Sequence, residues 1–386
     1  MTRMIPAEPE AGGVYVHVPF CVRKCAYCDF YSCADLTKIS AYVDAVIAEM
    51  GTRSDVSGIR DTLYFGGGTP SLLFPEQIAA IISSVRRRFD MAADTEITME
   101  ANPGTVGADN LAGWRKAGVN RINIGVQSFS DTALKFLTRI HSAADAVAAV
   151  DLARSAGFEN IGLDLIYGLP GQTAQSWRSD LEAALRLKPC HLSCYMLTYE
   201  PATPLTQSLE KGLFRRLSDK AVATLYDLTL RYLEDNGFYQ YEVSNFSTSR
   251  QTRSRHNQKY WTHAPYVGLG PSAHSLRADR RSWNVRFLDD YLERIGRGEL
   301  PMDGAEDLGP RELMMETLYL RLRCKDGIAI PEFNQRFAVD FQKFFAAPIA
   351  RYAAGGWVEA TDSFCRLTRK GMRYADGIAA GFIDVL

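Results

Sequence analysis

The sequence predicts an α/β protein: a partial (β/α)6 barrel of the TIM type, followed by a smaller, mostly helical C-terminal domain. Three observations support this prediction. Short apolar runs alternate with amphipathic stretches between residues 14 and 198, chemically reactive residues follow the apolar runs directly, and the pattern changes after Glu200. Repeated β-then-α units are typical of a parallel sheet covered by helices.

The apolar runs are the predicted strands of the barrel. Each is rich in apolar or β-branched residues, as in strands that are buried on both faces of a parallel sheet. Six such runs would make an open barrel, whereas eight would close one. They cover residues 14–18, 62–65, 96–99, 121–126, 162–167 and 191–197.

The stretches between these runs are the predicted helices, at residues 38–50, 75–89, 111–117, 143–156 and 174–187. A longer amphipathic helix is predicted at 218–236, where the alternation has ended. We therefore divide the chain into a barrel core (10–240), a connecting region (241–285) and a C-terminal domain (286–386). The last part of that domain predicts a small β-hairpin beside helices.

The composition is that of an ordinary globular protein. Of the 386 residues, 46% are hydrophobic and 23% are charged, and 44 basic residues balance 45 acidic ones. This balance predicts no nucleic-acid partner. No apolar run approaches the length of about 18 residues that a transmembrane helix needs. The N-terminus has no apolar signal region, and eight cysteines, three of them clustered, fit a reducing cytoplasm better than a disulfide framework.

Three cysteines, Cys21, Cys25 and Cys28, follow the first predicted strand with the spacing C-x3-C-x2-C. This spacing offers three thiolates to one metal centre and leaves a coordination position open. Iron-sulfur cubanes are normally held by four cysteines, so a set of three predicts an iron that is free to bind something else. The alternative is a zinc site that His17, Cys33 or a distant residue completes.

Polar residues and glycines follow the other predicted strands. Gly66 to Pro70 come after the second strand, Glu100 after the third, Gln127 after the fourth, and residues 168–170 after the fifth. The carboxyl ends of the strands form the active face of a βα barrel. We therefore expect these residues to converge with the cysteines on one face.

The cysteine motif and the Gly-Gly-Thr-Pro run at 67–70 resemble the radical S-adenosylmethionine (SAM) superfamily. The resemblance implies a [4Fe-4S] cluster whose fourth iron is chelated by SAM, and electron transfer from that cluster breaks the sulfonium bond of SAM. It assigns the cluster to Cys21, Cys25 and Cys28, and contacts with SAM to Tyr27, Gly67, Gly68 and Thr69.

Within that superfamily, the chain looks like the coproporphyrinogen dehydrogenase group over most of its length. The tyrosine six residues before the first cysteine, and the acidic, amide and basic residues after later strands, match that group at the same mutual spacing. The resemblance assigns further SAM contacts to Tyr15, Glu100, Gln127, Arg139 and Asp164. The plainer alternative for the charged residues is a set of salt bridges at the barrel mouth.

Phe30 is a departure from this group. The dehydrogenases carry a further cysteine two positions after the third, where this chain has Phe30. Phenylalanine cannot supply a thiol, and Cys33 lies three residues too late to match. We therefore do not expect this chain to decarboxylate porphyrinogens.

A second motif, His256-Asn-Gln-Lys-Tyr260-Trp261, matches the HNxxYW element of the HemW proteins, the haem-chaperone branch of this family. The resemblance implies haem binding by His256, with Tyr260 and Trp261 packed on the porphyrin. A neutral imidazole is a standard axial ligand of haem iron. His263 and His274 are alternative ligands, and a loop-capping histidine with two core aromatics is the structural alternative.

The resemblance as a whole implies a cytoplasmic haem chaperone that binds a [4Fe-4S] cluster, SAM and haem. Haem would pass to an acceptor haemoprotein; a membrane respiratory enzyme is one candidate, which would place the chaperone at the inner face of the membrane. The family often dimerises, so a homodimer is also implied. The alternatives are an oxygen-independent coproporphyrinogen III oxidase, another radical SAM enzyme acting on a tetrapyrrole, and a structural zinc protein.

Overall fold

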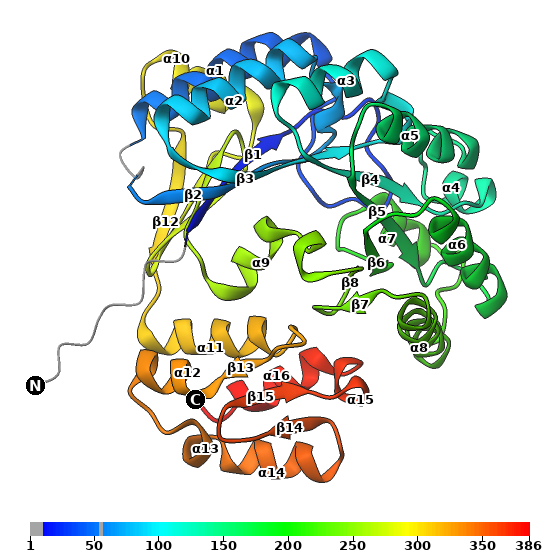
Figure 1. Cartoon of the computed structure of the whole chain (residues 1–386), viewed down its shortest axis with the longest axis vertical. Helices are drawn as coiled ribbons and strands as arrows, with labels where there is room; N and C mark the ends of the chain where they lie inside the picture. Colours follow the sequence, from blue (N-terminus) through cyan, green and yellow to red (C-terminus); the bar gives the residue numbers. More distant parts are fainter. Residues whose placement is uncertain (1–10, 54–56) are drawn as a thin grey trace, which may run out of the picture.

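A curved sheet of twelve strands is the larger of two sheets in the computed structural model, which describes residues 11–53 and 57–386 (Figure 1). The sheet has the strand order β12-β11-β10-β9-β1-β2-β3-β4-β5-β6-β8-β7. Residue 10, the predicted start of the barrel core, lies outside the described residues.

The six predicted strands are confirmed and lie side by side in chain order, all parallel. Register places Tyr15 beside Tyr64 and Met99 beside Ile122, so alternate side chains of neighbouring strands share one face. Their bounds are Gly12–Val18 (β1), Ile59–Gly67 (β2), Asp90–Ala101 (β3), Arg121–Gln127 (β4), Asn160–Tyr167 (β5) and His191–Met196 (β6).

Helices cover the outer, convex face of these strands (Figure 1). In α2, residues Ile78, Ile81, Ile82 and Val85 are buried at helical spacing, which explains why this stretch packs on the sheet as a helix. The predicted helices are confirmed as Ile39–Thr52 (α1), Pro75–Arg88 (α2), Ala108–Ala117 (α3), Ala143–Ser155 (α5) and Ala174–Arg186 (α6). Two short helices that we did not predict follow β4 and β6, at Asp131–Phe136 (α4) and Pro204–Glu210 (α7).

The barrel is open, because later parts of the chain extend both edges of the six-stranded unit. The strand β9 (Tyr266–Leu269) pairs in parallel with β1. Antiparallel strands continue from β9 on one side, and two short strands continue from β6 on the other. They are His274–Arg277 (β10), Arg280–Asn284 (β11), Met302–Asp307 (β12), Tyr239–Gln240 (β7) and Asn245–Ser247 (β8).

Three helices of the middle region have distinct positions. The predicted long helix is confirmed as α8 (Asp219–Asp235), which packs beside α6, and α10 (Leu288–Gly296) packs beside α1. The helix α9 (Arg255–Thr262) contains the HNxxYW motif and lies on the concave side of the sheet (Figure 1). Four 3-10 turns complete this part, at Leu36–Lys38, Pro70–Leu72, Pro103–Thr105 and Arg250–Thr252.

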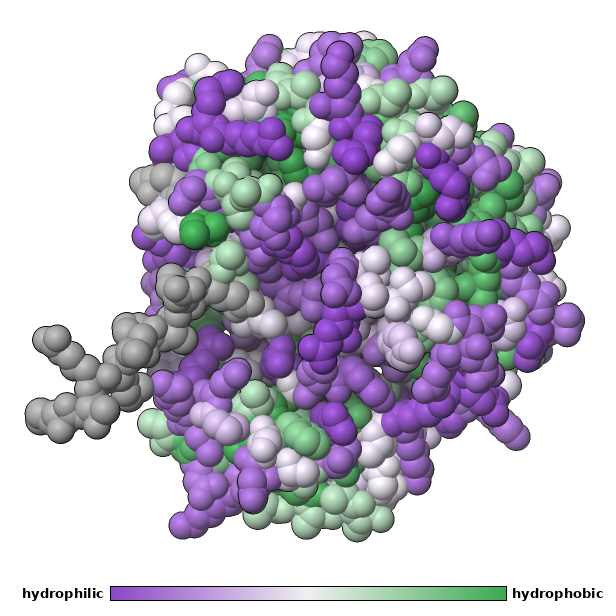
Figure 2. Space-filling model, in the orientation of Figure 1, coloured by the Kyte–Doolittle hydropathy of each residue, from purple (hydrophilic) through white to green (hydrophobic). Residues whose placement is uncertain are grey.

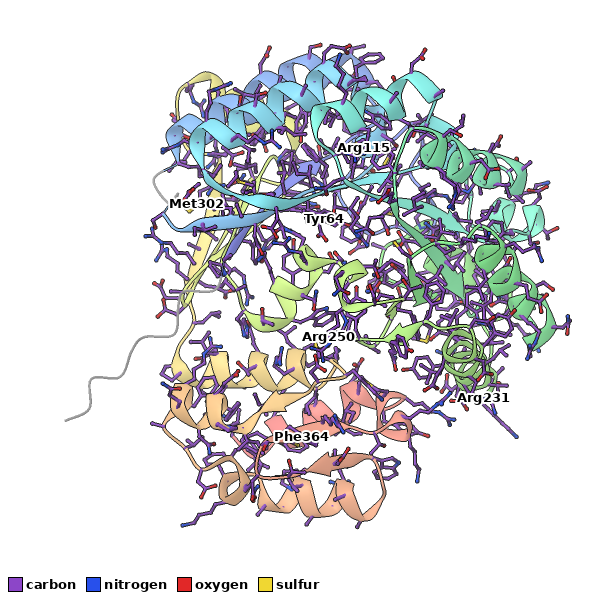
Figure 3. The ribbon with its side chains drawn as sticks, in the orientation of Figure 1. Tyr64, Arg115, Arg231, Arg250, Met302 and Phe364 are labelled. Atoms are coloured by element: carbon purple, nitrogen blue, oxygen red, sulfur yellow. The ribbon has the colours of Figure 1, made fainter. Side chains whose placement is uncertain are left out.

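A small helical domain follows the last strand of the large sheet and lies on the side of α9 (Figure 1). Its core is aromatic, with Phe333, Phe341, Phe345 and Phe382 in mutual ring contact. The predicted hairpin is confirmed as β14 (Val358–Ala360) and β15 (Phe364–Leu367), on which Figure 3 labels Phe364. The other elements are Pro310–Arg321 (α11), Ile328–Ala329 (β13), Ile330–Phe337 (α12), Phe341–Phe344 (α13), Ala346–Ala354 (α14), Arg369–Met372 (α15) and Ala375–Ile383 (α16).

The domain limits at 240 and 285 remain predictions. The strands on both sides of residue 285, β11 and β12, pair with each other within the large sheet. The face seen in Figure 2 is largely hydrophilic, with apolar residues scattered among polar ones. Within the described ranges, we find no helix with the length and apolarity needed to cross a bilayer.

Candidate functional site

A cavity of about 690 Å³ opens at the carboxyl ends of the parallel strands. The predicted convergence holds for the residues at the ends of the first four strands, which line this one cavity, but not for residues 168–170 after the fifth, of which Gly168 lines a second cavity instead. From the predicted set, the lining includes Cys21, Cys25, Tyr27, Cys28, Gly67, Gly68, Thr69, Glu100, Gln127, Arg139 and Asp164.

The cysteine loop is held at both ends by its backbone. The Cys21 N–H donates to the carbonyl of Cys33 (3.0 Å), and the Cys33 N–H donates to the carbonyl of Pro19 (2.6 Å). Between these anchors, the Cys28 N–H donates to the carbonyl of Cys25 (3.2 Å), which forms a turn. The three thiols are thereby presented from one short, closed loop.

Two side chains approach the cysteine sulfurs. The hydroxyl of Thr69 lies 3.5 Å from the Sγ of Cys21, and Arg139 Nη1 lies 3.5 Å from the Sγ of Cys25. Burial raises the pKa of the Cys21 thiol, whereas the hydrogen bond from Thr69 lowers it. The thiolate is the form of cysteine that binds metal.

No three side chains of His, Cys, Asp or Glu in the described parts of the chain are grouped as ligands of one metal ion. An iron-sulfur cluster needs cysteines that reach three separate irons. The partly buried loop with three cysteines, one Arg139 contact and no acidic ligand suits such a cluster by its donor chemistry.

Glycines bring the backbone of the β2 end close to the cysteine loop. A Cβ at Gly68 would lie 2.6 Å from the carbonyl oxygen of Phe20, closer than any side chain can approach. Gly67 has φ +110°, a conformation that disfavours other residues. The Gly68 N–H donates to the carbonyl of Val18 (2.8 Å) and so ties this run to β1.

Glu100 lies at the floor of the cavity. The Tyr64 hydroxyl donates to its Oε1 (2.7 Å), and Tyr64 projects from β2 to the inner side of the sheet (Figure 3). Burial raises the pKa of Glu100 to about 7, although the hydrogen bond from Tyr64 lowers it. The group therefore exchanges its proton near neutral pH.

Asp164 and Asn123 form a second polar site in the wall. Asn123 Nδ2 donates to Asp164 Oδ2 (2.6 Å), and burial raises the pKa of Asp164. Asp164 Oδ1 and Asn123 Oδ1 are buried without a hydrogen-bond partner among the described residues. Such acceptors need donors from a ligand, for example hydroxyl or amine groups.

Arg139 and Gln127 complete the opposite wall. Arg139 Nη2 donates to the carbonyl of Gly125 (2.8 Å), which fixes the guanidinium above the sheet. Its Nε is buried without an acceptor within the described ranges. Gln127 has φ +66°, because the chain turns sharply at the end of β4. The cavity therefore has hydrogen-bond donors from Arg139 in one part of its lining and acceptor oxygens from Asp164 and Asn123 in another.

Tyr15 does not line the cavity but lies beneath it. Its hydroxyl is 3.1 Å from His17 Nδ1, and its ring stacks on that of Tyr64 (6.2 Å between centroids). Tyr15 therefore supports Tyr64, which in turn holds Glu100. Tyr15 is absent from the cavity lining, and its predicted contact with SAM stays a prediction.

Phe30 stands at the rim of the cavity with 68% of its side chain exposed. It offers neither a sulfur nor a proton to a ligand. Cys33, the next cysteine along the chain, is not part of the cavity lining. The position that Phe30 occupies thus has no thiol that could replace the missing cysteine.

His256, the predicted haem ligand, is fully buried on the concave side of the sheet. Its Nδ1 is hydrogen bonded to Thr62 Oγ1 (2.8 Å) and its Nε2 to the hydroxyl of Tyr260 (2.9 Å). The ring stacks on Tyr64 (5.1 Å, 26°) and Tyr15 (6.2 Å, 25°). Burial lowers its pKa to about 3, so the ring is neutral. Both ring nitrogens are engaged in this conformation.

The cavity does not include His256, Tyr260 or Trp261, and the haem role of these residues remains a prediction. Among the alternative ligands, His263 Nε2 is 3.0 Å from Glu316 Oε2. His274 is exposed and its ring lies 5.9 Å from that of Trp283.

Sequence reasoning missed Asn123, which lines the cavity, and Tyr64, which does not line it but donates a hydrogen bond to Glu100. Both are inward-facing residues of predicted strands: Tyr64 is two residues before Gly66, and Asn123 is two before Gly125. The period-two alternation of a strand could have identified them.

Comparisons with known proteins agree with this geometry. The model of the Radical SAM superfamily matches residues 15–184, and that of the HemN C-terminal domain matches residues 308–374. The chain is 31% identical to the "Heme chaperone HemW" of Bacillus subtilis over 376 residues, which cover 96% of this chain and 99% of the relative. It is 41% identical to the protein of the same name from Escherichia coli over 292 residues, 75% of this chain and 74% of the relative.

The fold is that of a solved radical SAM structure. Coproporphyrinogen III oxidase (HemN) from Escherichia coli superimposes with a TM-score of 0.83 at 24% identity, covering 98% of this chain and 91% of the other. The radical SAM barrel and the smaller C-terminal domain predicted from sequence are thereby confirmed. With the extent and identity of these matches, the chain belongs to the HemW family of the radical SAM superfamily.

Proposed function

We propose that this chain is a haem chaperone that binds a [4Fe-4S] cluster, SAM and haem, and transfers haem to acceptor haemoproteins. The observation that carries the proposal is the first cavity. Its lining includes the three cysteines and residues assigned to SAM, and its rim has Phe30 where the dehydrogenases have a further cysteine. The names of the relatives, which are haem chaperones at 31–41% identity, support it.

The cluster would be held by Cys21, Cys25 and Cys28. When bound, the cluster and SAM supply one-electron chemistry at the open iron. Around them, this chain's own residues bind and orient. Arg139 donates toward Cys25 and into the cavity, and Asp164 presents an unpaired oxygen for a ligand hydroxyl or amine.

Glu100 would carry the charge that a ligand ammonium requires. Its pKa of about 7 means that it is close to half ionised at neutral pH, and an approaching cation would favour the ionised form. Tyr64 donates to it, and Tyr15 with His256 packs beneath Tyr64. These packed rings therefore determine where the Glu100 carboxylate lies in the cavity.

Haem is the proposed cargo, and haemoproteins are the proposed acceptors. Membrane respiratory enzymes are the first class of acceptor to test. The proposed compartment is the cytoplasm. Ligation of haem by His256 would require release of Thr62 from Nδ1 or of Tyr260 from Nε2, since one ring nitrogen binds the iron and the other can keep its hydrogen bond. Pairing of two copies during transfer is part of the proposal.

Anaerobic reconstitution of the cluster, followed by haem titration on the same sample, tests the function. We expect a saturable Soret band of defined stoichiometry, haem transfer to an apo-haemoprotein, and no conversion of coproporphyrinogen. Failure to bind haem, or transfer no faster than from free haem, would contradict the proposal.

The second candidate is an oxygen-independent coproporphyrinogen III oxidase. The structural likeness to that enzyme over nearly the whole chain favours it, and Phe30 opposes it. Substrate-dependent formation of 5′-deoxyadenosine together with decarboxylated porphyrinogen would establish this candidate. A protein that carries zinc without iron or sulfide would exclude both functions.

A further inference from the structure

A second, larger cavity of about 1290 Å³ adjoins the first. It lies between the end of β6, the first turns of α8, and the start of α16 in the C-terminal domain. The two cavities share part of their walls. The shared residues are Tyr195, Met196, Leu197, Thr198 and Glu200.

The lining of the second cavity includes several large apolar and aromatic side chains. Met196 and Tyr195 are 48% and 40% exposed at the end of β6, and Tyr374, just before α16, is 55% exposed. Val222 and Tyr226 of α8 also line the cavity. Large apolar side chains exposed together in a cavity indicate a ligand with an apolar face.

The charged residues of this cavity differ in whether they have partners. Arg373 forms an ion pair with Asp227, and Asp376 pairs with Arg323 (2.5 Å), so these charges are compensated. Arg216 and Lys220 also line the cavity, and neither has an ion-pair partner within the described parts of the chain. Both are exposed, at the start of α8.

Two acidic residues also line the cavity. Asp219 is in the first turn of α8, where the helix N-terminus favours a carboxylate, and Glu200 lies on the side shared with the first cavity. The free cations are therefore concentrated at the α8 edge. This arrangement suits a flat apolar ligand that carries carboxylates along one edge.

We propose that the second cavity is the haem site, with the macrocycle between Met196 and Tyr374 and the two propionates on Arg216 and Lys220. The proposal rests on the haem-chaperone function and locates its cargo away from α9. Because the macrocycle and carboxylates carry the recognition, a porphyrin without iron binds at the same place.

The shared wall makes the two sites interdependent. A macrocycle against Met196 contacts residues that also bound the SAM cavity, so each ligand changes the affinity of the other by the same factor. Haem affinity therefore depends on SAM, and SAM affinity on haem.

Charge reversal at the cavity edge tests the proposal in the full-length, cluster-loaded protein. The variant Arg216→Glu/Lys220→Glu is compared with Arg215→Glu/Lys211→Glu, which changes the same charge at neighbouring exposed positions outside the lining. Affinity is measured with haem by its Soret band and with zinc protoporphyrin IX by fluorescence. We expect a loss of at least ~10-fold for both ligands in the first variant and less than ~2-fold in the control.

A second variant tests the apolar wall without changing charge. Val222→Trp fills the cavity from α8, and Val147→Trp on the outer helix α5 is its control. We expect weakened porphyrin binding, retained cluster content, and an unchanged unfolding midpoint relative to the control.

The outcomes separate this inference from the function on which it rests. If the wild-type protein binds no porphyrin, the haem-chaperone function fails. If it binds haem and both cavity variants bind as tightly as their controls, this location is wrong while the function stands. Loss of haem only on His256→Ala would place the site at α9 instead.

Discussion

His256 illustrates, at the scale of the residue, how burial decides what a side chain can do. The motif letters suggest an iron ligand, but the fold encloses the ring between Thr62, Tyr64 and Tyr260. In this conformation the imidazole acts as a packing and hydrogen-bonding unit beneath the SAM cavity. Its contribution in this conformation is to stability and to the position of Tyr64, while its role toward haem remains a prediction.

Replacing His256 with alanine should destabilise the protein by about 2–4 kcal/mol, because a stacked ring and two buried hydrogen bonds are lost together. Urea unfolding measures this change. The exposed His274→Ala variant is the control and should differ from wild type by less than about 0.5 kcal/mol. Equal stabilities of the two variants would show that the stack contributes nothing.

Glu100 predicts a pH dependence of SAM binding. Because its pKa is raised to about 7, the Glu100 carboxyl is mostly protonated below that pH. It must lose this proton before it can form an ion pair with the ammonium group of a ligand. SAM affinity should therefore increase as the pH rises through about 7, and Glu100→Gln should weaken binding ~10-fold or more and remove this dependence. Equilibrium dialysis between about pH 6 and pH 8 measures it. Titration of SAM itself affects both proteins equally, so a pH dependence in Glu100→Gln as large as that of the wild type would rule out Glu100.

At the scale of the element, the glycine run after β2 holds the cysteine loop. Gly68 donates to Val18 and lies against Phe20, so strand β1, its loop and the end of β2 form one unit. The cysteines therefore depend on close backbone packing as well as on their own spacing.

The variant Gly68→Ala should lower cluster occupancy, because its Cβ would lie 2.6 Å from the Phe20 carbonyl and must displace the cysteine loop. Iron and sulfide content after anaerobic reconstitution measures the effect. Gly107→Ala, where a Cβ meets nothing within 4 Å, is the matched control. Full occupancy in Gly68→Ala would show that the loop tolerates the displacement.

The same elements show what a sequence can predict. Apolar runs identified six of the parallel strands, since burial on both faces leaves a continuous apolar signal, but not the short strand β9, which pairs in parallel with β1. The site residues followed, because parallel strands present their carboxyl ends together. The strand β11, whose residues are Arg-Arg-Ser-Trp-Asn, carries no such signal, because pairing with β10 and β12 rather than burial defines it.

The burial of His256 and the second cavity could not be predicted for a different reason. Thr62 and His256 are hydrogen bonded although a large part of the chain separates them, and the second cavity is lined by β6, α8 and α16. Such features depend on how distant elements pack. No local pattern encodes them.

At the scale of the whole molecule, Glu242 lies where the barrel sheet meets the C-terminal domain. It is buried, and its backbone forms a bridge with Cys324. Burial raises the pKa of Glu242 to about 7 from its ordinary value of 4.5. The folded protein thus keeps a proton here that the unfolded chain releases at lower pH.

The free energy of unfolding should therefore fall as the pH rises from about 4.5 to about 7, because the folded state binds more protons than the unfolded state over this range. Glu242→Gln should remove about 2–3 kcal/mol of this fall. Urea unfolding at about pH 5 and pH 8 in the variant, in wild type and in exposed Glu210→Gln measures the difference. A fall in Glu242→Gln as large as that in Glu210→Gln would contradict the assignment.

The pairing of β9 with β1 has a consequence for biogenesis. Tyr15 of β1 lies beside Gly268, so the strand that leads into the cysteine loop is enclosed on both sides only after the ribosome has passed Leu269. During synthesis, the cysteines emerge early on a strand that still lacks its second neighbour. Stable cluster insertion must therefore await synthesis of β9, and nascent chains halted before Tyr266 should retain less iron than chains released beyond Leu269.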